Sequence, residues 1–281
     1  MYRTFRIPQL AFLGAGTLAE TLTKGFIAAG ALQINQIWAS APSDTHVMKL
    51  GCKTTTDNVK LVKENKLVAL SVKPQVLPKV LREISPHITP DHLLLSFAAG
   101  MKIRNMQYLL PPKTRIARLM TNTPTQFREG VSSFALGPHC READRKLIQD
   151  LMSTVGYCTE VKENLLDVVT GFAGGGPAYA YCFIEAIADA AVLGGMTREE
   201  AMKMAAKSVL GAARMVEETG DHPGKLKDDV CSAGGSTIRG IHALEKGRMR
   251  SAVIDAVNAA TERSSELGKI LNEQGSSNKI F

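Results

Sequence analysis

The sequence predicts two domains of different class: an α/β domain over residues 1–162 and an all-α domain over residues 163–281. The first half alternates short apolar runs with amphipathic stretches, which is the rhythm of βαβ units around a parallel sheet. After Glu163 the strand signals stop, and the composition shifts to Ala, Gly and Met with helical periodicity. A length of 281 residues is long for one compact core and short for three, so two domains are the first expectation.

The strands of the first domain are expected where apolar runs are bounded by turn residues. Leu10–Leu13 is the first, followed by a helix over Thr17–Ala29 and a second strand over Gln36–Ser40. Each later run also leads into turn chemistry or a helical pattern. The remaining expected strands are Leu67–Val72, His92–Phe97, Arg115–Met120, Val131–Leu136 and Tyr157–Val161.

The second domain is expected to consist of long helices. Apolar residues recur at spacings of three and four over Arg198–Glu218, and Thr197 with Glu200 resembles a capping box. Pro177–Leu193 is helical by pattern, and its many alanines imply close packing, either in an intrachain core or against a second subunit. A last helix is expected over Ser251–Leu271, with the polar residues 272–277 fraying.

Composition and charge exclude several classes of function. The five cysteines are scattered without a Cys-x-x-Cys pair, which argues against a disulfide framework and a structural zinc site, so no metal is expected. The net charge of +7 is spread along the chain without an aromatic-flanked basic cluster, so nucleic acid is not an expected partner. The charge instead suits an enzyme with anionic ligands.

The apolar runs are too short for a membrane span, which needs about 18 residues. Met1–Ile7 is also too short for a persuasive leader. A cytoplasmic location is expected, with a mitochondrial one left open.

A glycine-rich loop stands at the start of the α/β domain. The segment Gly14-Ala15-Gly16-Thr17-Leu18-Ala19 follows an apolar strand and opens a helix, the context in which a G-x-G-x-x-A pattern has meaning. Gly14 would allow the tight turn, Gly16 would admit a pyrophosphate, and Ala19 would permit close packing of helix on strand. The pattern favours a Rossmann-like dinucleotide site, although a tight turn without a ligand uses the same residues.

The end of the second expected strand bears on which nicotinamide cofactor fits. An acidic residue there would accept from the ribose hydroxyls of NAD and repel the 2′-phosphate of NADP. No acid occurs between Ser40 and Asp44, which favours NADPH. No Arg stands beside Ser40 to hold the phosphate, so NADH stays open as well. Ser40 and Ser43 are candidates for phosphate contacts, or they are simple turn formers.

Three further segments make the assignment more specific. They are Val72-Lys73-Pro74, the first signature Thr170–Tyr179 (TGFAGGGPAY), and the second signature Asp228–Ile238 (DDVCSAGGSTI). Together with the glycine loop they resemble the pyrroline-5-carboxylate reductase family, over Gln9–Leu271. The family pattern has serines where this chain has Ala173 and Gly175, and proline at Ala233.

The resemblance implies NAD(P)H-dependent reduction of the cyclic imine 1-pyrroline-5-carboxylate to proline, the last step of proline biosynthesis. It also implies an interlocked homodimer through the helical domain, commonly assembled into a decamer. Substrate contacts would fall on Glu163, Ser236 and Thr237. The implied cofactor contacts are Gly14, Ala15, Gly16, Thr17, Leu18, Ala19, Ser40, Asn58, Val72, Lys73, Pro74, Ala98, Ala99 and Asp229, the last standing where the family often has Asn.

The chemistry of this reaction asks for orientation rather than for a catalytic base. A cyclic imine is electrophilic, so the protein must place it against the nicotinamide and hold its carboxylate. The turn Gly234-Gly235-Ser236-Thr237 suits that task, because it would direct amides and two hydroxyls toward one anion, and Ser236 and Thr237 are the candidate catalytic residues. An N-cap role for Ser236 and Thr237 is compatible with the same geometry. The six histidines assemble into no site, and neither His222 nor His242 is expected to be catalytic.

Two other functions compete with this interpretation. A β-hydroxyacid dehydrogenase shares the domain plan, but the segment after Gly171 lacks the helical Lys that serves as its base. A cofactor-sensing protein that has lost turnover would be compatible with the departures at Ala173, Gly175 and Ala233.

Overall fold

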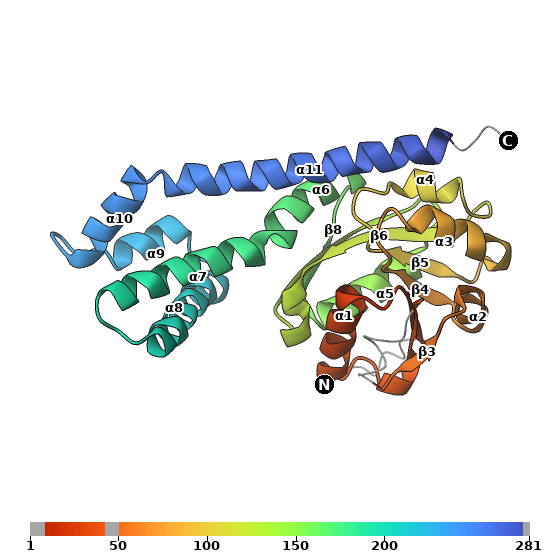
Figure 1. Ribbon diagram of the computed structural model, residues 1–281, viewed down its shortest axis with the longest axis horizontal. Coiled ribbons are helices and arrows are strands. Elements are labelled where there is room, and N and C mark those ends of the chain that lie inside the picture. The colour runs from red at the N-terminus through yellow and green to blue at the C-terminus, as the bar shows by residue number, and fades with distance from the viewer. Residues whose placement is uncertain (1–8, 43–50, 278–281) are drawn as a thin grey trace. The chain divides into compact units, whose positions relative to one another are not determined.

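The computed structural model describes residues 9–42 and 51–277 and divides into two compact units. Figure 1 shows the first in red to green together with the dark blue end of α11, and the second in green to blue. The first unit comprises residues 1–175 together with 258–281, and the second comprises residues 176–257. The predicted fold class is confirmed, since an α/β unit precedes a helical one. The division falls later than the predicted boundary because Leu166, Val169 and Ala173 belong to the core of the first unit.

The first unit is built on a sheet with strand order β3-β2-β1-β4-β5-β6-β7-β8. Neighbouring strands are parallel except for β6 and β7, which pair antiparallel. All the predicted strands are present. Of the strands in the described residues, the short polar strand β3 was missed, because Lys-Thr-Thr carries no apolar run. The strands are β1 Leu10–Leu13, β2 Ile37–Ser40, β3 Lys53–Thr55, β4 Leu67–Leu70, β5 Leu93–Ser96, β6 Arg115–Thr121, β7 Gly130–Leu136 and β8 Gly156–Glu160.

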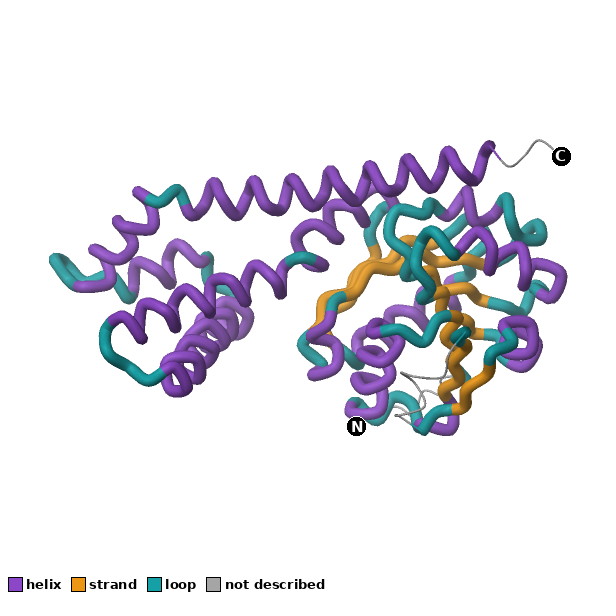
Figure 2. Tube along the Cα trace, in the orientation of Figure 1, coloured by secondary structure: helices purple, strands orange, loops and turns teal. Residues whose placement is uncertain are grey.

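Helices cover both faces of this sheet, which Figure 2 shows in orange. Side chains of β1 alternate between two buried clusters: Ala11 and Leu13 face α2, α3 and α4, whereas Leu10 and Phe12 face α1 and α5. Burial on both faces explains why the parallel strands are continuous apolar runs. The helices are α1 Thr17–Ala28, α2 Asn58–Glu64, α3 Leu77–Ile84, α4 Ile103–Gln107, α5 Glu142–Ser153 and α6 Leu166–Val169, followed by a π-helix over Thr170–Gly174.

Short 3₁₀ helices connect several of these elements. They are Ile34–Gln36, Ser85–His87, Thr123–Phe127 and Glu163–Leu165.

The second unit is helical, as predicted. It contains α7 Gly176–Leu193, α8 Arg198–Thr219, α9 Pro223–Asp229, α10 Ser236–Lys246 and the first part of α11 Met249–Ser277. The Thr197 hydroxyl caps α8 by accepting from the Glu200 amide at 3.3 Å. The predicted reciprocal bond is absent, because the Glu200 carboxylate accepts from the Thr197 hydroxyl at 2.9 Å instead. Helix α11 continues through Ser277, beyond the predicted helix end at Leu271.

The helical unit buries little apolar surface within a single chain. Its buried cluster consists of Ala188, Ala201 and Ala205. Many large apolar side chains are exposed, among them Leu193 at 90% and Val230 at 64%. Exposed apolar surface of this extent marks an interaction face. Among the described residues, no helix combines the length and apolarity that a membrane span requires.

Candidate functional site

The glycine loop has the geometry that its sequence predicts. Gly14 has φ +103°, and a Cβ on it would lie 2.7 Å from the backbone nitrogen of Val72, so only glycine fits there. Gly16 is the N-cap of α1, and a Cβ on it would meet nothing within 4 Å. The backbone at Gly16 is therefore open to a ligand at the start of a twelve-residue helix. These residues fit the pyrophosphate of a dinucleotide.

The loop lies at the topological switch point of the sheet. Strand β1 pairs with β2 on one side and with β4 on the other, so the connections after β1 and β4 leave in opposite directions. Ligands of open α/β sheets bind at this point, outside the carboxyl ends of the strands. Hydrogen bonds tie the two ends together, because Ser71 Oγ donates to the Gly14 carbonyl at 2.6 Å. Val72, Lys73 and Pro74 continue from there, with Lys73 exposed.

Ser40 and Asn58, two predicted cofactor residues, are in direct contact. The buried Ser40 Oγ donates to Asn58 Oδ1 at 2.5 Å, and Asn58 Nδ2 donates to Glu83 Oε2 at 3.0 Å. The Ser40 hydroxyl would have to rotate away from Asn58 to donate to a phosphate. Ser43 and Asp44, which also entered the choice between NADPH and NADH, lie outside the described residues.

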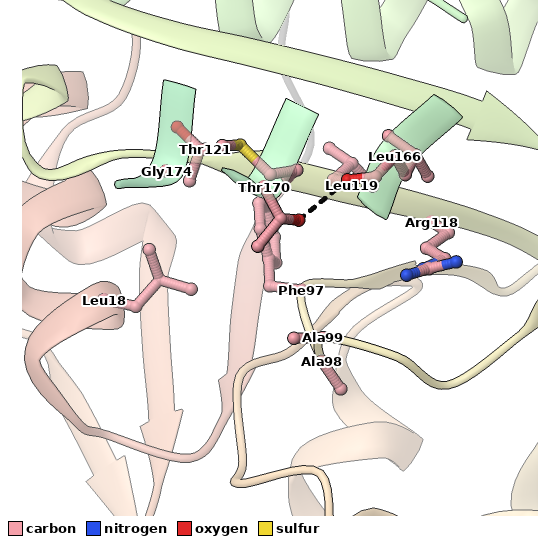
Figure 3. A pocket seen from close by; sticks show the side chains of 11 residues that line it. Leu18, Phe97, Ala98, Ala99, Arg118, Leu119, Thr121, Leu166, Thr170 and Gly174 are labelled. Carbon is pink, nitrogen blue, oxygen red and sulfur yellow. Dashed lines mark hydrogen bonds between the residues drawn. The ribbon is translucent and has the colours of Figure 1, made fainter. Parts of the chain in front are cut away.

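A pocket in the first unit brings several sequence motifs together. Leu18 from the start of α1, Ala98 and Ala99 from the loop after β5, and Thr170 and Gly174 from the first signature all line it (Figure 3). The other lining residues are Phe97, Arg118, Leu119, Met120, Thr121 and Leu166. The lining is largely apolar, which suits a flat ring more than a phosphate. Three of the predicted cofactor residues therefore meet at the edge where the glycine loop lies.

Arg118 is the charged side chain of this pocket, and sequence reasoning missed it. The residue is 3% exposed; its Nη2 donates to Asp167 Oδ1 at 2.9 Å, and its Nη1 lies 3.8 Å from Glu163 Oε1. Glu163, the predicted substrate contact, also accepts from the Ile103 amide at 2.7 Å. The Glu163 carboxylate is thus hydrogen-bonded to the first residue of α4. A charged residue inside the apolar run of β6 was the available signal.

The first signature forms the π-helix, which contains Ala173, one of the departures from the family pattern. The amide of Asn122 donates to the Ala173 carbonyl at 3.0 Å, which anchors this segment to the end of β6. Ala173 is buried in the apolar core, where a serine hydroxyl would need a partner. A Cβ at Gly174 would lie 3.0 Å from Met120 Cε, so the segment packs tightly there. Gly175 closes the segment by donating its amide to the Thr170 carbonyl at 3.1 Å.

The second signature forms a glycine turn into α10. Gly234 has φ +69°, and Gly235 is the N-cap of the helix, with Ser236 and Thr237 in its first turn. Both hydroxyl residues are exposed, and neither supplies a side-chain cap. The capping alternative for Ser236 and Thr237 therefore finds no support. Asp229 ends α9 and accepts from Lys225 Nζ at 3.1 Å.

The surroundings of Cys158, His92 and His222 indicate structural rather than catalytic roles for these side chains. Burial raises the pKa of the Cys158 thiol to about 12, which keeps it protonated at neutral pH. Burial also lowers the pKa of His92, whose Nε2 lies 3.0 Å from the Val62 carbonyl. His222 caps α9 by accepting from the Gly224 amide. Within residues 9–42 and 51–269 no group of His, Cys, Asp and Glu could hold a metal ion.

Comparison with known proteins adds family information to this geometry. A family model described as pyrroline-5-carboxylate reductase dimerisation matches residues 163–267. A second, described as NADP oxidoreductase coenzyme F420-dependent, matches residues 9–100. The two matches cover the glycine loop and both signatures. The dimerisation match shows that the chain carries an oligomerisation region.

Curated relatives and solved structures agree with these matches. The chain is 42% identical over 264 residues to pyrroline-5-carboxylate reductase 3 of Rattus norvegicus, covering 93% of this chain and 96% of the relative. It is 41% identical to pyrroline-5-carboxylate reductase 2 of Homo sapiens, covering 95% and 86%. A Plasmodium falciparum pyrroline carboxylate reductase with NADP bound superposes with a TM-score of 0.87 at 29% identity, covering 94% and 98% of the two chains. The chain belongs to the pyrroline-5-carboxylate reductase family of NAD(P)-dependent oxidoreductases.

Proposed function

We propose that this chain reduces 1-pyrroline-5-carboxylate to proline and that NADPH is its preferred hydride donor. The observation that carries the proposal is the pocket that joins Leu18, Ala98 and Ala99 to the first signature at the switch point of the sheet. The 42% identity to a named reductase over nearly the whole chain supports the same reaction.

Separate residues of the chain would bind the cofactor and orient the substrate. The nicotinamide supplies hydride when the cofactor is bound. The amides at the start of α1 would hold the pyrophosphate, and the apolar pocket would keep water from the ring. Ser236 and Thr237 would hold the substrate carboxylate, so that one face of the imine is presented. A protonated imine accepts hydride directly, and this route asks for no enzyme base.

The direct test incubates purified protein with NADPH and 1-pyrroline-5-carboxylate and measures proline. Proline formation that tracks enzyme concentration would support the proposal, whereas no proline at any enzyme concentration would refute it. A β-hydroxyacid dehydrogenase would instead reduce NADP with a hydroxyacid. A cofactor-sensing protein would bind NADPH and turn over neither substrate.

Replacing Ser40 by Asp is expected to reverse or abolish the preference for NADPH. A carboxylate at the end of β2 would repel the 2′-phosphate and accept from the ribose hydroxyls. The side chain already faces Asn58, so the new charge would lie at the end of the strand. The measurement is kcat/KM for NADPH and for NADH in both proteins. An unchanged ratio would show that the phosphate binds elsewhere.

We further propose a homodimer formed through the helical unit, with dimers assembling into a decamer. The thin buried cluster of this unit and its exposed apolar side chains support the dimer. The matched dimerisation region, residues 163–267, includes this unit. Ala178, Ala186, Ala190 and Gly194 are not buried within the single chain, so they are free to pack against a partner.

Replacing Ala190 by Phe is expected to weaken subunit association by roughly 1–3 kcal/mol, because a packed helix contact cannot absorb the added volume without strain. Sedimentation at several concentrations measures the dissociation. Ala143→Phe is the matched control, since Ala143 is exposed on α5 of the first unit. A native protein that is monomeric at micromolar concentration would contradict the assembly proposal.

A further inference from the structure

The C-terminal part of α11 touches the loop that follows β5. A Cβ built on Gly268 would lie 2.9 Å from the carbonyl oxygen of Gly100, and one built on Gly100 would lie 2.8 Å from the Gly268 Cα. Gly100 has φ +78° and is buried, as is Gly268. Two glycines thus allow a backbone-to-backbone contact directly after Ala98 and Ala99, which line the pocket.

A second contact from the same stretch of α11 reaches the pocket arginine. The buried Ser264 hydroxyl donates to Asp167 Oδ1 at 3.1 Å, the oxygen that also accepts from Arg118 Nη2 at 2.9 Å. Ser264, which contacts the Asp167–Arg118 pair, and Gly268, which contacts the loop, are thus one turn apart on α11.

The loop is held at several points, and α11 supplies one of them. At its start the Phe97 amide donates to the Leu70 carbonyl at 3.0 Å, and at its end Glu163 accepts from the Ile103 amide at 2.7 Å. Between these points Gly100 rests on Gly268. Ala98 and Met101 are buried in the apolar core on either side of this contact, so Gly268 sets the position of the backbone between them, next to Ala99.

We propose that Gly268 and Ser264 are positioning residues, through which α11 sets the place of Ala98 and Ala99 and hence of the nicotinamide end of the cofactor. The inference rests on the proposed function. It assigns a role in the active site to a helix outside the glycine loop and both signatures. The adenosine end, at Ser40, touches neither contact and would stay unaffected.

The decisive variant is Gly268→Ala, with Lys269→Ala as the matched control on the next, exposed position of the same helix. Alanine is favoured over glycine inside a helix by about 1 kcal/mol, so any loss arises from the contact with Gly100. A displacement of the loop by about 1 Å is expected to lower kcat roughly 10- to 100-fold. Ser264→Ala should act in the same direction with a smaller effect.

Two binding measurements separate positioning from general damage. NADPH is expected to bind Gly268→Ala more weakly, with altered nicotinamide fluorescence. Adenosine 2′,5′-bisphosphate, which lacks the nicotinamide, should bind with an unchanged Kd. Equal weakening of both ligands, or an unchanged kcat in a folded variant, would overturn the proposal. A wild-type protein that makes no proline would refute the proposed reaction, whereas the two binding measurements would still test the positioning.

Discussion

Replacing Arg118 by Met is expected to lower the free energy of unfolding by about 3 kcal/mol. The guanidinium pairs with Asp167, whose side chain is 16% exposed, and removing one partner of a buried pair leaves an uncompensated charge at a cost of about 3–5 kcal/mol. The lower end applies because the hydroxyl of Ser264 still donates to Asp167. Glu163 adds little, since it lies 3.8 Å from Nη1 and is 32% exposed.

Thermal unfolding of the variant measures this effect. A loss of about 3 kcal/mol corresponds to a fall in Tm of roughly 6–12 °C for a domain of 150–250 residues. Arg104→Met is the matched control, because Arg104 is exposed on α4. The double variant Arg118→Met, Asp167→Leu removes both charges and should recover part of the loss. A Tm that is unchanged in Arg118→Met would show that the pair is neutral for stability.

The sequence could predict the glycine loop because its determinants are local. A strand, a turn that requires glycine and a helix start follow one another within Leu10–Ala19, so spacing alone identifies them. The central strands were equally accessible, since burial on both faces makes each an apolar run. Strand β3 carries no such run, because it lies at the edge of the sheet formed by the described strands, beside β2.

The features that were not predicted depend on contacts between distant parts of the chain. The π-helix is anchored by Asn122, and the loop after β5 is supported by Gly268, which no local pattern links to it. Arg118 is an intermediate case. Its place inside an apolar strand indicates a buried charge, but its partners Asp167 and Glu163 follow only from the fold.

Replacing Thr237 by Ala is expected to lower kcat/KM for 1-pyrroline-5-carboxylate roughly ten- to one-hundred-fifty-fold. A hydrogen bond to a charged group contributes about 1.5–3 kcal/mol, and the hydroxyl of Thr237 would donate to the substrate carboxylate. NADPH affinity should change little, because Thr237 is assigned to the substrate. Thr237→Ser retains the hydroxyl and should keep most of the activity.

The alternative is that Thr237 stabilises α10, in which case Thr237→Ala would lose about 1 kcal/mol of stability with normal turnover. The structure argues against this outcome, because Gly235 is the N-cap and the exposed Thr237 supplies no cap. Ser251→Ala, which removes a hydroxyl from the first turn of α11, is the control for helix-start effects. Steady-state kinetics, NADPH titration and thermal unfolding on the same variants separate the two roles. Normal kcat/KM in a destabilised Thr237→Ala would assign Thr237 to the scaffold.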